Sequence, residues 1–168
     1  NPSRRANQLG ETEISLSEKV SGTNNQHYNA GALALHGWPE EGGKAEDAYV
    51  SWTVAPKDVE LSIEEVRMGL FHTGEEPLNA VLAWKVGDGE WSEAEVETEK
   101  PVKKTGIFNG RGIPAHVDLA GAAELREVTE PVEFRLYLWP GSGIQGLGKI
   151  PLDKHHEDLV VRGRILAD

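Results

Sequence analysis

The chain has 168 residues and carries 28 Asp and Glu against 17 Lys and Arg, which gives a formal net charge of −11 with neutral histidines. That length fits one domain, and the lack of cysteine excludes a disulfide framework and cysteine-ligated metal sites. The acidic balance argues against nucleic acid or an anionic membrane as a partner, because both attract positive charge. No apolar run approaches the ~20 residues that span a bilayer.

Residues 1–10 are polar, include Pro2, Arg4 and Arg5, and show no hydrophobic period. They are predicted to form a linker or disordered arm, and residues 11–168 are predicted to form the folded domain. We expect the arm to connect this domain to a longer polypeptide.

From residue 11 onward, apolar and polar residues alternate in short runs that end at Gly, Pro, Asn or Asp. A period of two predicts strands, because successive side chains of a strand point to opposite faces. The run at 132–139 is the clearest alternation in the chain. The predicted strands are 12–16, 32–35, 49–54, 59–63, 66–71, 79–86, 91–97, 116–119, 132–139 and 158–165.

The connections between these runs carry turn residues. Gly87-Asp88-Gly89 predicts a tight hairpin turn, and the segments 40–47, 104–114 and 140–149 are predicted to be loops. Residues 124–126 are predicted to form at most a single helical turn. Nine or ten short strands at even spacing predict an all-β fold, an antiparallel β-sandwich or jelly roll.

Four short motifs, in this order, resemble jelly-roll accessory domains of secreted bacterial proteins. They are Tyr49–Val54 after Gly37-Trp38-Pro39, the hairpin Trp84–Trp91, the strand Phe134–Trp139, and the closing strand Glu157–Ile165. The relatives of such domains are carbohydrate-binding modules, often found beside polysaccharide-degrading catalytic domains. The resemblance implies a jelly roll that binds a polysaccharide, located outside a bacterial cell and linked to a catalytic or surface domain. One departure is the pair Glu157-Asp158, where that family often has two aspartates.

No residue pattern predicts catalysis. Glu93, Glu95, Glu97 and Glu99 alternate along one run, and we interpret them as a sheet face in contact with water. Gly141-Ser142-Gly143 is too short for a nucleophile elbow. The chain is therefore predicted not to be an enzyme, and a jelly-roll lyase or hydrolase remains as the weaker alternative, since paired carboxylates need a spacing that sequence does not show.

The sequence contains residues for two kinds of metal site. His155 and His156 are adjacent, so on an extended chain they point to opposite faces and do not favour zinc. Calcium accepts carboxylate oxygens, and the resemblance implies a structural Ca²⁺ between the opening and closing strands. Glu13 and Asp158 are the predicted ligands, and the alternative is that these acids only cap strand ends.

The five tryptophans differ in their sequence context. Trp52 lies inside an apolar strand and is predicted to be in the core, whereas Trp84 shares a face with Leu82 that is either the core or a concave binding surface. Trp38, Trp91 and Trp139 lie at strand edges or loops. These three are predicted to be exposed and to stack on sugar rings.

Polar loop residues complete the predicted site. Arg111 lies between glycines in an acidic chain, and its fork of donors suits a carboxylate or sulfate of an anionic sugar. Asn109 and His72 are predicted to add directional hydrogen bonds. The sequence thus predicts a monomeric, non-catalytic carbohydrate-binding module. The main alternative is a structural spacer or docking domain without a ligand, whose aromatic residues would be buried.

Overall fold

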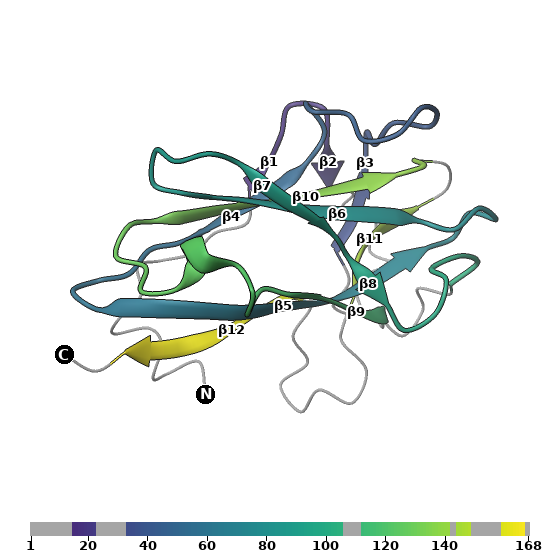
Figure 1. The fold of residues 1–168 in the computed structure, drawn as a ribbon. Coiled ribbons are helices and arrows are strands. Elements are labelled where there is room, and N and C mark those ends of the chain that lie inside the picture. The colour runs from purple at the N-terminus through teal and green to yellow at the C-terminus, as the bar shows by residue number, and fades with distance from the viewer. Residues whose placement is uncertain (1–14, 23–32, 106–111, 142–143, 149–158, 167–168) are drawn as a thin grey trace.

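The computed structural model describes residues 15–22, 33–105, 112–141, 144–148 and 159–166 (Figure 1). The predicted arm at residues 1–10 and the first part of the predicted opening strand lie outside these residues. The described chain forms two antiparallel sheets that lie face to face (Figure 1).

The first sheet has five strands, in the order β1-β4-β10-β6-β7. Its central strand, β10, pairs along most of its length with β6 on one side and with β4 on the other. The strands are β1 (Ser15–Leu16), β4 (Val50–Val54), β10 (Val132–Trp139), β6 (Asn79–Val86) and β7 (Ser92–Glu95).

The second sheet has seven strands, six of them in the order β2-β3-β11-β5-β9-β8, with the seventh, β12, paired to β5. The 3-10 turn η2 (Ala123–Leu125) confirms the predicted helical turn. The strands are β2 (Ser21–Gly22), β3 (Leu33–His36), β11 (Gln145–Leu147), β5 (Glu60–His72), β9 (Ile113–Asp118), β8 (Glu97–Thr98) and β12 (Leu159–Leu166).

The path of the chain gives the sandwich its jelly-roll character. The strands β4, β6 and β10 of the first sheet alternate along the chain with β5, β9 and β11 of the second. Each step in this series moves from one sheet to the other, and the consecutive strands that do pair within a sheet are β2–β3, β6–β7 and β8–β9 in the described residues. The predicted fold class, an all-β antiparallel sandwich of jelly-roll type, is confirmed.

The boundaries differ from the prediction at several places, three of which have a structural explanation. The predicted strands 59–63 and 66–71 form one strand, β5. The sequence pattern suggests two strands because the phase of burial along β5 changes where its pairing with β12 shifts register, between Arg162 and Gly163. The predicted strand 91–97 divides at Val96 into β7 of one sheet and β8 of the other. The short strand β11 lies inside a segment predicted to be a loop, because three residues are too few to show a period.

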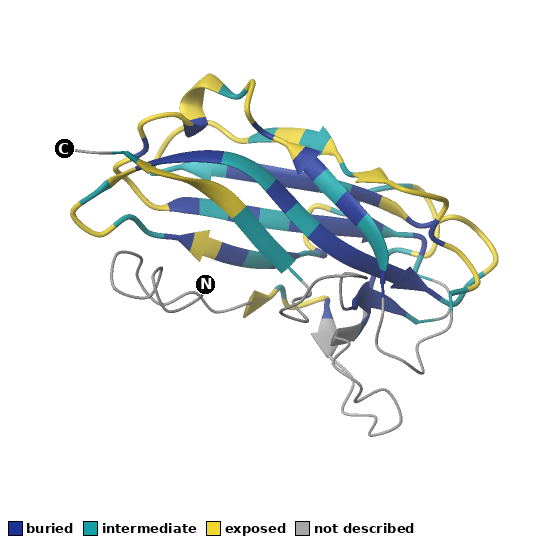
Figure 2. Ribbon diagram, turned by 90° about the horizontal axis from the view of Figure 1, so that it is seen from below, coloured by how far each residue is buried: buried dark blue, intermediate teal, exposed yellow. Residues whose placement is uncertain are grey.

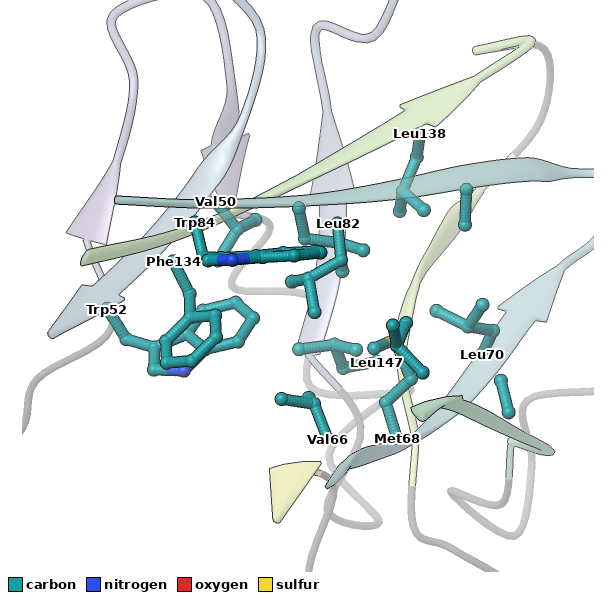
Figure 3. Packing of buried hydrophobic residues seen from close by; sticks show 14 of the residues in the cluster. Val50, Trp52, Val66, Met68, Leu70, Leu82, Trp84, Phe134, Leu138 and Leu147 are labelled. Carbon is teal, nitrogen blue, oxygen red and sulfur yellow. The ribbon is translucent and has the colours of Figure 1, made fainter. Parts of the chain in front are cut away.

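The core consists of the inward faces of the two sheets (Figure 3). Trp52 and Phe134 stack, with ring centroids 5.6 Å apart and planes inclined by 16°, and Val66 and Met68 of β5 lie across from them. Trp52 is in the core as predicted. Buried and less buried residues alternate along the strands (Figure 2), as expected when one face of each strand packs inward.

Trp84 also belongs to the core, which answers the question that the sequence left open. Its ring lies among the buried side chains of β6 and β10 (Figure 3). Its indole N–H donates a hydrogen bond to the Glu124 carboxylate of η2 at 2.8 Å. The inward face of β6 is therefore packed and offers no concave binding surface.

We expect Phe134→Ala to lower the free energy of unfolding by about 3–5 kcal/mol, because it removes a fully buried ring and leaves a cavity beside Trp52. Chemical denaturation monitored by circular dichroism measures the change. Leu16→Ala is the control, since that side chain is 39% exposed and its loss should cost less than about 0.5 kcal/mol. Equal effects of the two substitutions would contradict the assigned core.

Candidate functional site

The prediction that Trp38 is exposed is wrong. Only 4% of this residue is accessible, and it belongs to the core cluster. The segment after β10 covers it: the Gly141 N–H donates to the Pro39 carbonyl at 2.8 Å. A Cβ at Gly141 would lie 2.4 Å from the Trp38 carbonyl oxygen, so the two backbones are in direct contact. This packing joins residues about a hundred positions apart, which sequence alone does not reveal.

His72, predicted to open a loop and to offer a ligand a directional hydrogen bond, is instead inside a strand and out of reach of the surface. His72 is the last residue of β5 and is fully buried, facing inward opposite Gln145 of β11. The signal was present in the sequence, because position 72 continues the inward alternation of Met68 and Leu70. Within the described residues neither ring nitrogen of His72 has a hydrogen-bond partner, and the Gln145 side-chain carbonyl has none either.

The remaining predicted residues fall into two groups. Trp91 is exposed, as predicted, at 40% accessibility, and Trp139 is partly exposed at the end of β10. Both lie at the sheet β1-β4-β10-β6-β7. The other predicted residues, which are two candidate ligand contacts and two candidate metal ligands, lie outside the described residues: Asn109, Arg111, Glu13 and Asp158.

The glutamate run is solvated, as interpreted from the sequence. Glu93 and Glu95 lie on β7, Glu97 lies on β8, and all are exposed, as is Glu99. They do not share one strand face, because the chain changes sheet at Val96. In the described part of the chain, no group of three or more His, Asp or Glu residues is placed to hold a metal ion.

An aromatic and charged layer covers the outward face of the five-stranded sheet. The strand register explains its position, since Ser51, Arg135 and Ala83 lie side by side on β4, β10 and β6. The long Arg135 side chain therefore rises between two small neighbours. We call this layer the outer cluster, and it contains Lys44, Glu46, Tyr49, Lys85, Trp91, Glu93, Glu133, Arg135 and Tyr137.

Arg135 is the centre of the outer cluster. Its guanidinium carbon lies 4.3 Å from the ring centroid of Tyr49 and 4.4 Å from that of Trp91. Its Nε donates to the Glu133 carboxylate at 2.7 Å. The ammonium group of Lys85 lies 5.2 Å from the Trp91 ring centroid. Both cations are thus within the range of attraction to an aromatic ring.

Lys44 attaches the β3–β4 connection to the same face. Its Nζ donates to Glu93 at 2.6 Å, forms an ion pair with Glu46 at 3.0 Å, and lies 4.7 Å from the Tyr137 ring centroid. The connection lies on the outer side of the sheet (Figure 1). As a result Tyr137 is only 3% accessible, although it points outward from β10.

Two pKa shifts describe the electrostatics of the outer cluster. Burial acts to lower the pKa of Lys44, but hydrogen bonds and charge attraction from Glu93 and Glu46 outweigh it and raise that pKa. Burial raises the pKa of Tyr137, and Arg135 opposes this shift. The cluster therefore keeps Lys44 charged and Tyr137 neutral well into the alkaline range.

Sequence reasoning did not identify Lys44, Tyr49, Arg135 and Tyr137 as site residues. A signal existed for the last three, because aromatic and arginine side chains occupy the polar positions of the alternating runs at 49–54 and 132–139. Only the pairing of β4 with β10 shows that these positions are adjacent.

The arrangement offers an exposed aromatic ring surrounded by charged hydrogen-bonding groups. Such a surface can pack against an apolar face of a ligand and hydrogen-bond to polar groups at its edge.

In the residues that the structure describes, no helix is long and apolar enough to cross a membrane.

No protein-family model matches this chain, and no curated protein matches it. Among solved structures, the chain is similar to TmCBM61, determined in complex with beta-1,4-galactotriose. The identity is 13% and the TM-score is 0.45, with 95% of this chain and 93% of that chain covered. That structure is a carbohydrate-binding module, the class that the sequence motifs resemble. Similarity at this level does not transfer a ligand or a site.

The raised pKa of Tyr137 predicts a loss of stability at high pH. The unfolded chain releases this proton near pH 10.0, whereas the folded chain retains it, so the free energy of unfolding falls as pH rises past about 10. Thermal unfolding between pH 9 and 11 measures the effect. Tyr137→Phe should flatten part of the slope, whereas the exposed, non-titrating control Leu16→Ala should leave it unchanged. Identical slopes for the two variants would contradict this assignment.

Burial lowers the pKa of His72, opposed in part by Gln145 and Glu76. The folded state therefore holds a neutral imidazole, whereas the unfolded chain takes up a proton near pH 6.5. The free energy of unfolding should fall as pH drops below about 6.5, by at most ~1.4 kcal/mol per pH unit. Denaturant titrations from pH 7.5 to 5 should show this slope reduced in His72→Phe and retained in the non-titrating control Leu16→Ala. A slope that persists in His72→Phe would refute the assignment.

Proposed function

We propose that this chain is a non-catalytic carbohydrate-binding domain, and that its glycan lies against the outer cluster on the five-stranded sheet. The observation that carries this proposal is the position of Trp91. This residue is 40% exposed, and its ring contacts Arg135 and Lys85. A sugar ring has an apolar face that packs on an indole, and hydroxyl groups at its edge that need hydrogen-bond partners.

Polar groups of suitable chemistry surround this ring. The Glu93 carboxylate is 56% exposed and accepts hydrogen bonds from hydroxyl groups, and the Lys85 ammonium donates them. Asn79 and the partly exposed Trp139 lie opposite each other at the far end of β6 and β10, and they offer a second polar and aromatic contact on the same sheet. These groups support binding of a chain of sugars.

The finer parts of the proposal rest on the sequence resemblance. We propose that the domain belongs to a larger, secreted or cell-surface bacterial protein, and keeps a linked catalytic or surface domain near its polysaccharide. It is proposed to act as a monomer. A structural Ca²⁺ held by Glu13 and Asp158 remains a proposal, as do ligand contacts from Asn109 and Arg111.

A structural spacer or docking domain is the second candidate function. Burial of Trp38, Trp52 and Trp84 favours the spacer function, because these three aromatic residues pack in the core and are not available to a ligand. A spacer accounts for those rings, but it assigns no role to the exposed ring of Trp91.

Titration of tryptophan fluorescence with neutral and anionic polysaccharides, including a β-1,4-galactan, tests the proposed function. We expect a saturable change with one class of glycan, and at least a ~10-fold weaker affinity for Trp91→Ala, in the range of a central interface residue. Because Trp91 is itself a reporter, affinity electrophoresis repeats the comparison.

Ile165→Ala is the matched control, since Ile165 is a 43% exposed apolar residue on the other sheet and its loss should leave affinity unchanged. If the folded wild-type protein binds none of the polysaccharides, the spacer function is favoured and the proposed function is wrong.

A further inference from the structure

Arg135 is already engaged by the protein on several sides. The rings of Tyr49 and Trp91 both lie within 4.4 Å of its guanidinium carbon, and Glu133 accepts from its Nε. A planar guanidinium favours this combination, because it stacks on rings through its faces and donates through its edge. These contacts make Arg135 part of the structure of the site, since its guanidinium lies against two rings and its Nε is bonded to Glu133.

Trp91 depends on that arginine for its position. It lies before β7, outside any strand, after the turn at Gly87-Asp88-Gly89. Its ring contacts the charged ends of Arg135 and Lys85. A ring on a loop is not held by strand pairing, so contacts of this kind can fix where its stacking surface lies.

The charges of the outer cluster balance one another. Lys44 is paired with Glu46 and Glu93, and Arg135 is paired with Glu133. With Lys85, three cations face three carboxylates, and the exposed Glu95 lies two residues beyond Glu93 on β7. Counted with Glu95, four carboxylates on this face stand against three cations, and this excess of negative charge disfavours an approaching carboxylate or sulfate.

We propose that Arg135 is a positioning residue that holds Trp91 as the stacking surface, and that the site therefore takes a neutral glycan rather than a uronate or a sulfated sugar. This inference rests on the proposed function, because it concerns the ligand of the same site. In this arrangement Arg135 contacts Trp91 and Glu133 and takes no part in recognising the charge of the ligand.

Two variants separate positioning from charge recognition. Arg135→Lys keeps the positive charge and loses the planar group, and Glu133→Gln keeps the arginine and removes its counter-charge. Arg67→Lys and Glu65→Gln are matched controls, because these residues form an ion pair with the same two-residue spacing on β5, with Nε and Oε1 3.7 Å apart. Chemical denaturation verifies that each variant is folded.

The first measurement needs no ligand. Acrylamide quenching of fluorescence, with Trp91→Phe subtracted in each background, reports the accessibility of Trp91. We expect a higher quenching constant for Trp91 in Arg135→Lys and an unchanged one in Arg67→Lys. An unchanged constant in both variants would overturn the positioning role, whether or not any glycan binds.

The second measurement compares a neutral galactan with polygalacturonate at low and high salt. We expect the wild-type protein to bind only the neutral polymer, with no salt dependence, and Arg135→Lys to bind it about two- to fivefold more weakly. Glu133→Gln should gain salt-sensitive binding of polygalacturonate, since it frees Arg135 for a ligand carboxylate, whereas Glu65→Gln should not.

The outcomes distinguish the two proposals. If wild type binds polygalacturonate in a salt-sensitive manner that Arg135→Lys abolishes, glycan binding stands but the inference is wrong. If wild type binds a neutral glycan and Arg135→Lys binds it equally well, the positioning role of Arg135 is wrong and the proposed glycan binding stands. If no glycan binds, the proposed function and the ligand class fall together, and the quenching result still decides the role of Arg135.

Discussion

The stack of Phe134 on Trp52 is the contact on which the rest of the molecule depends. It joins β10 to β4 inside the core at the point where the two strands pair in register. Because side chains alternate along a strand, a fixed inward position for Phe134 also fixes Arg135 on the outward face. The core therefore positions the surface that we propose to be functional, and a shift of one residue would bury the arginine.

The outer cluster shows how such a surface becomes rigid without being buried. Arg135 comes from strand β10, Tyr49 from the residue before β4 and Trp91 from a loop, and both rings contact the guanidinium of Arg135. Preorganised rings lose little conformational entropy when a ligand stacks on them, whereas free loop aromatics lose much of it. This difference separates a binding surface from an incidental exposed tryptophan.

Alternation in the sequence predicted β6 and β10 to the residue, and it predicted the burial of Trp52. It could not distinguish a loop aromatic that folds back from one that stays in water, and so the prediction for Trp38 was wrong, whereas the burial of His72 follows from the alternation of β5 carried on to its last residue. Trp38 is covered by residues near position 141, and His72 lies opposite Gln145. Contacts over such distances depend on the strand order, and the same is true of the outer cluster, whose members are spread from position 44 to position 137.

The exposed glutamates of β7 also matter for a chain that would work at high local concentration on a polymer. This strand lies at the end of the five-stranded sheet, where backbone groups are open to pairing with another molecule. A second copy that added its own β7 there would bring the carboxylates of Glu93 and Glu95 against their equivalents. Like charges opposite each other destabilise a strand pair, so crowded copies along one fibre would remain separate instead of joining into a continuous sheet.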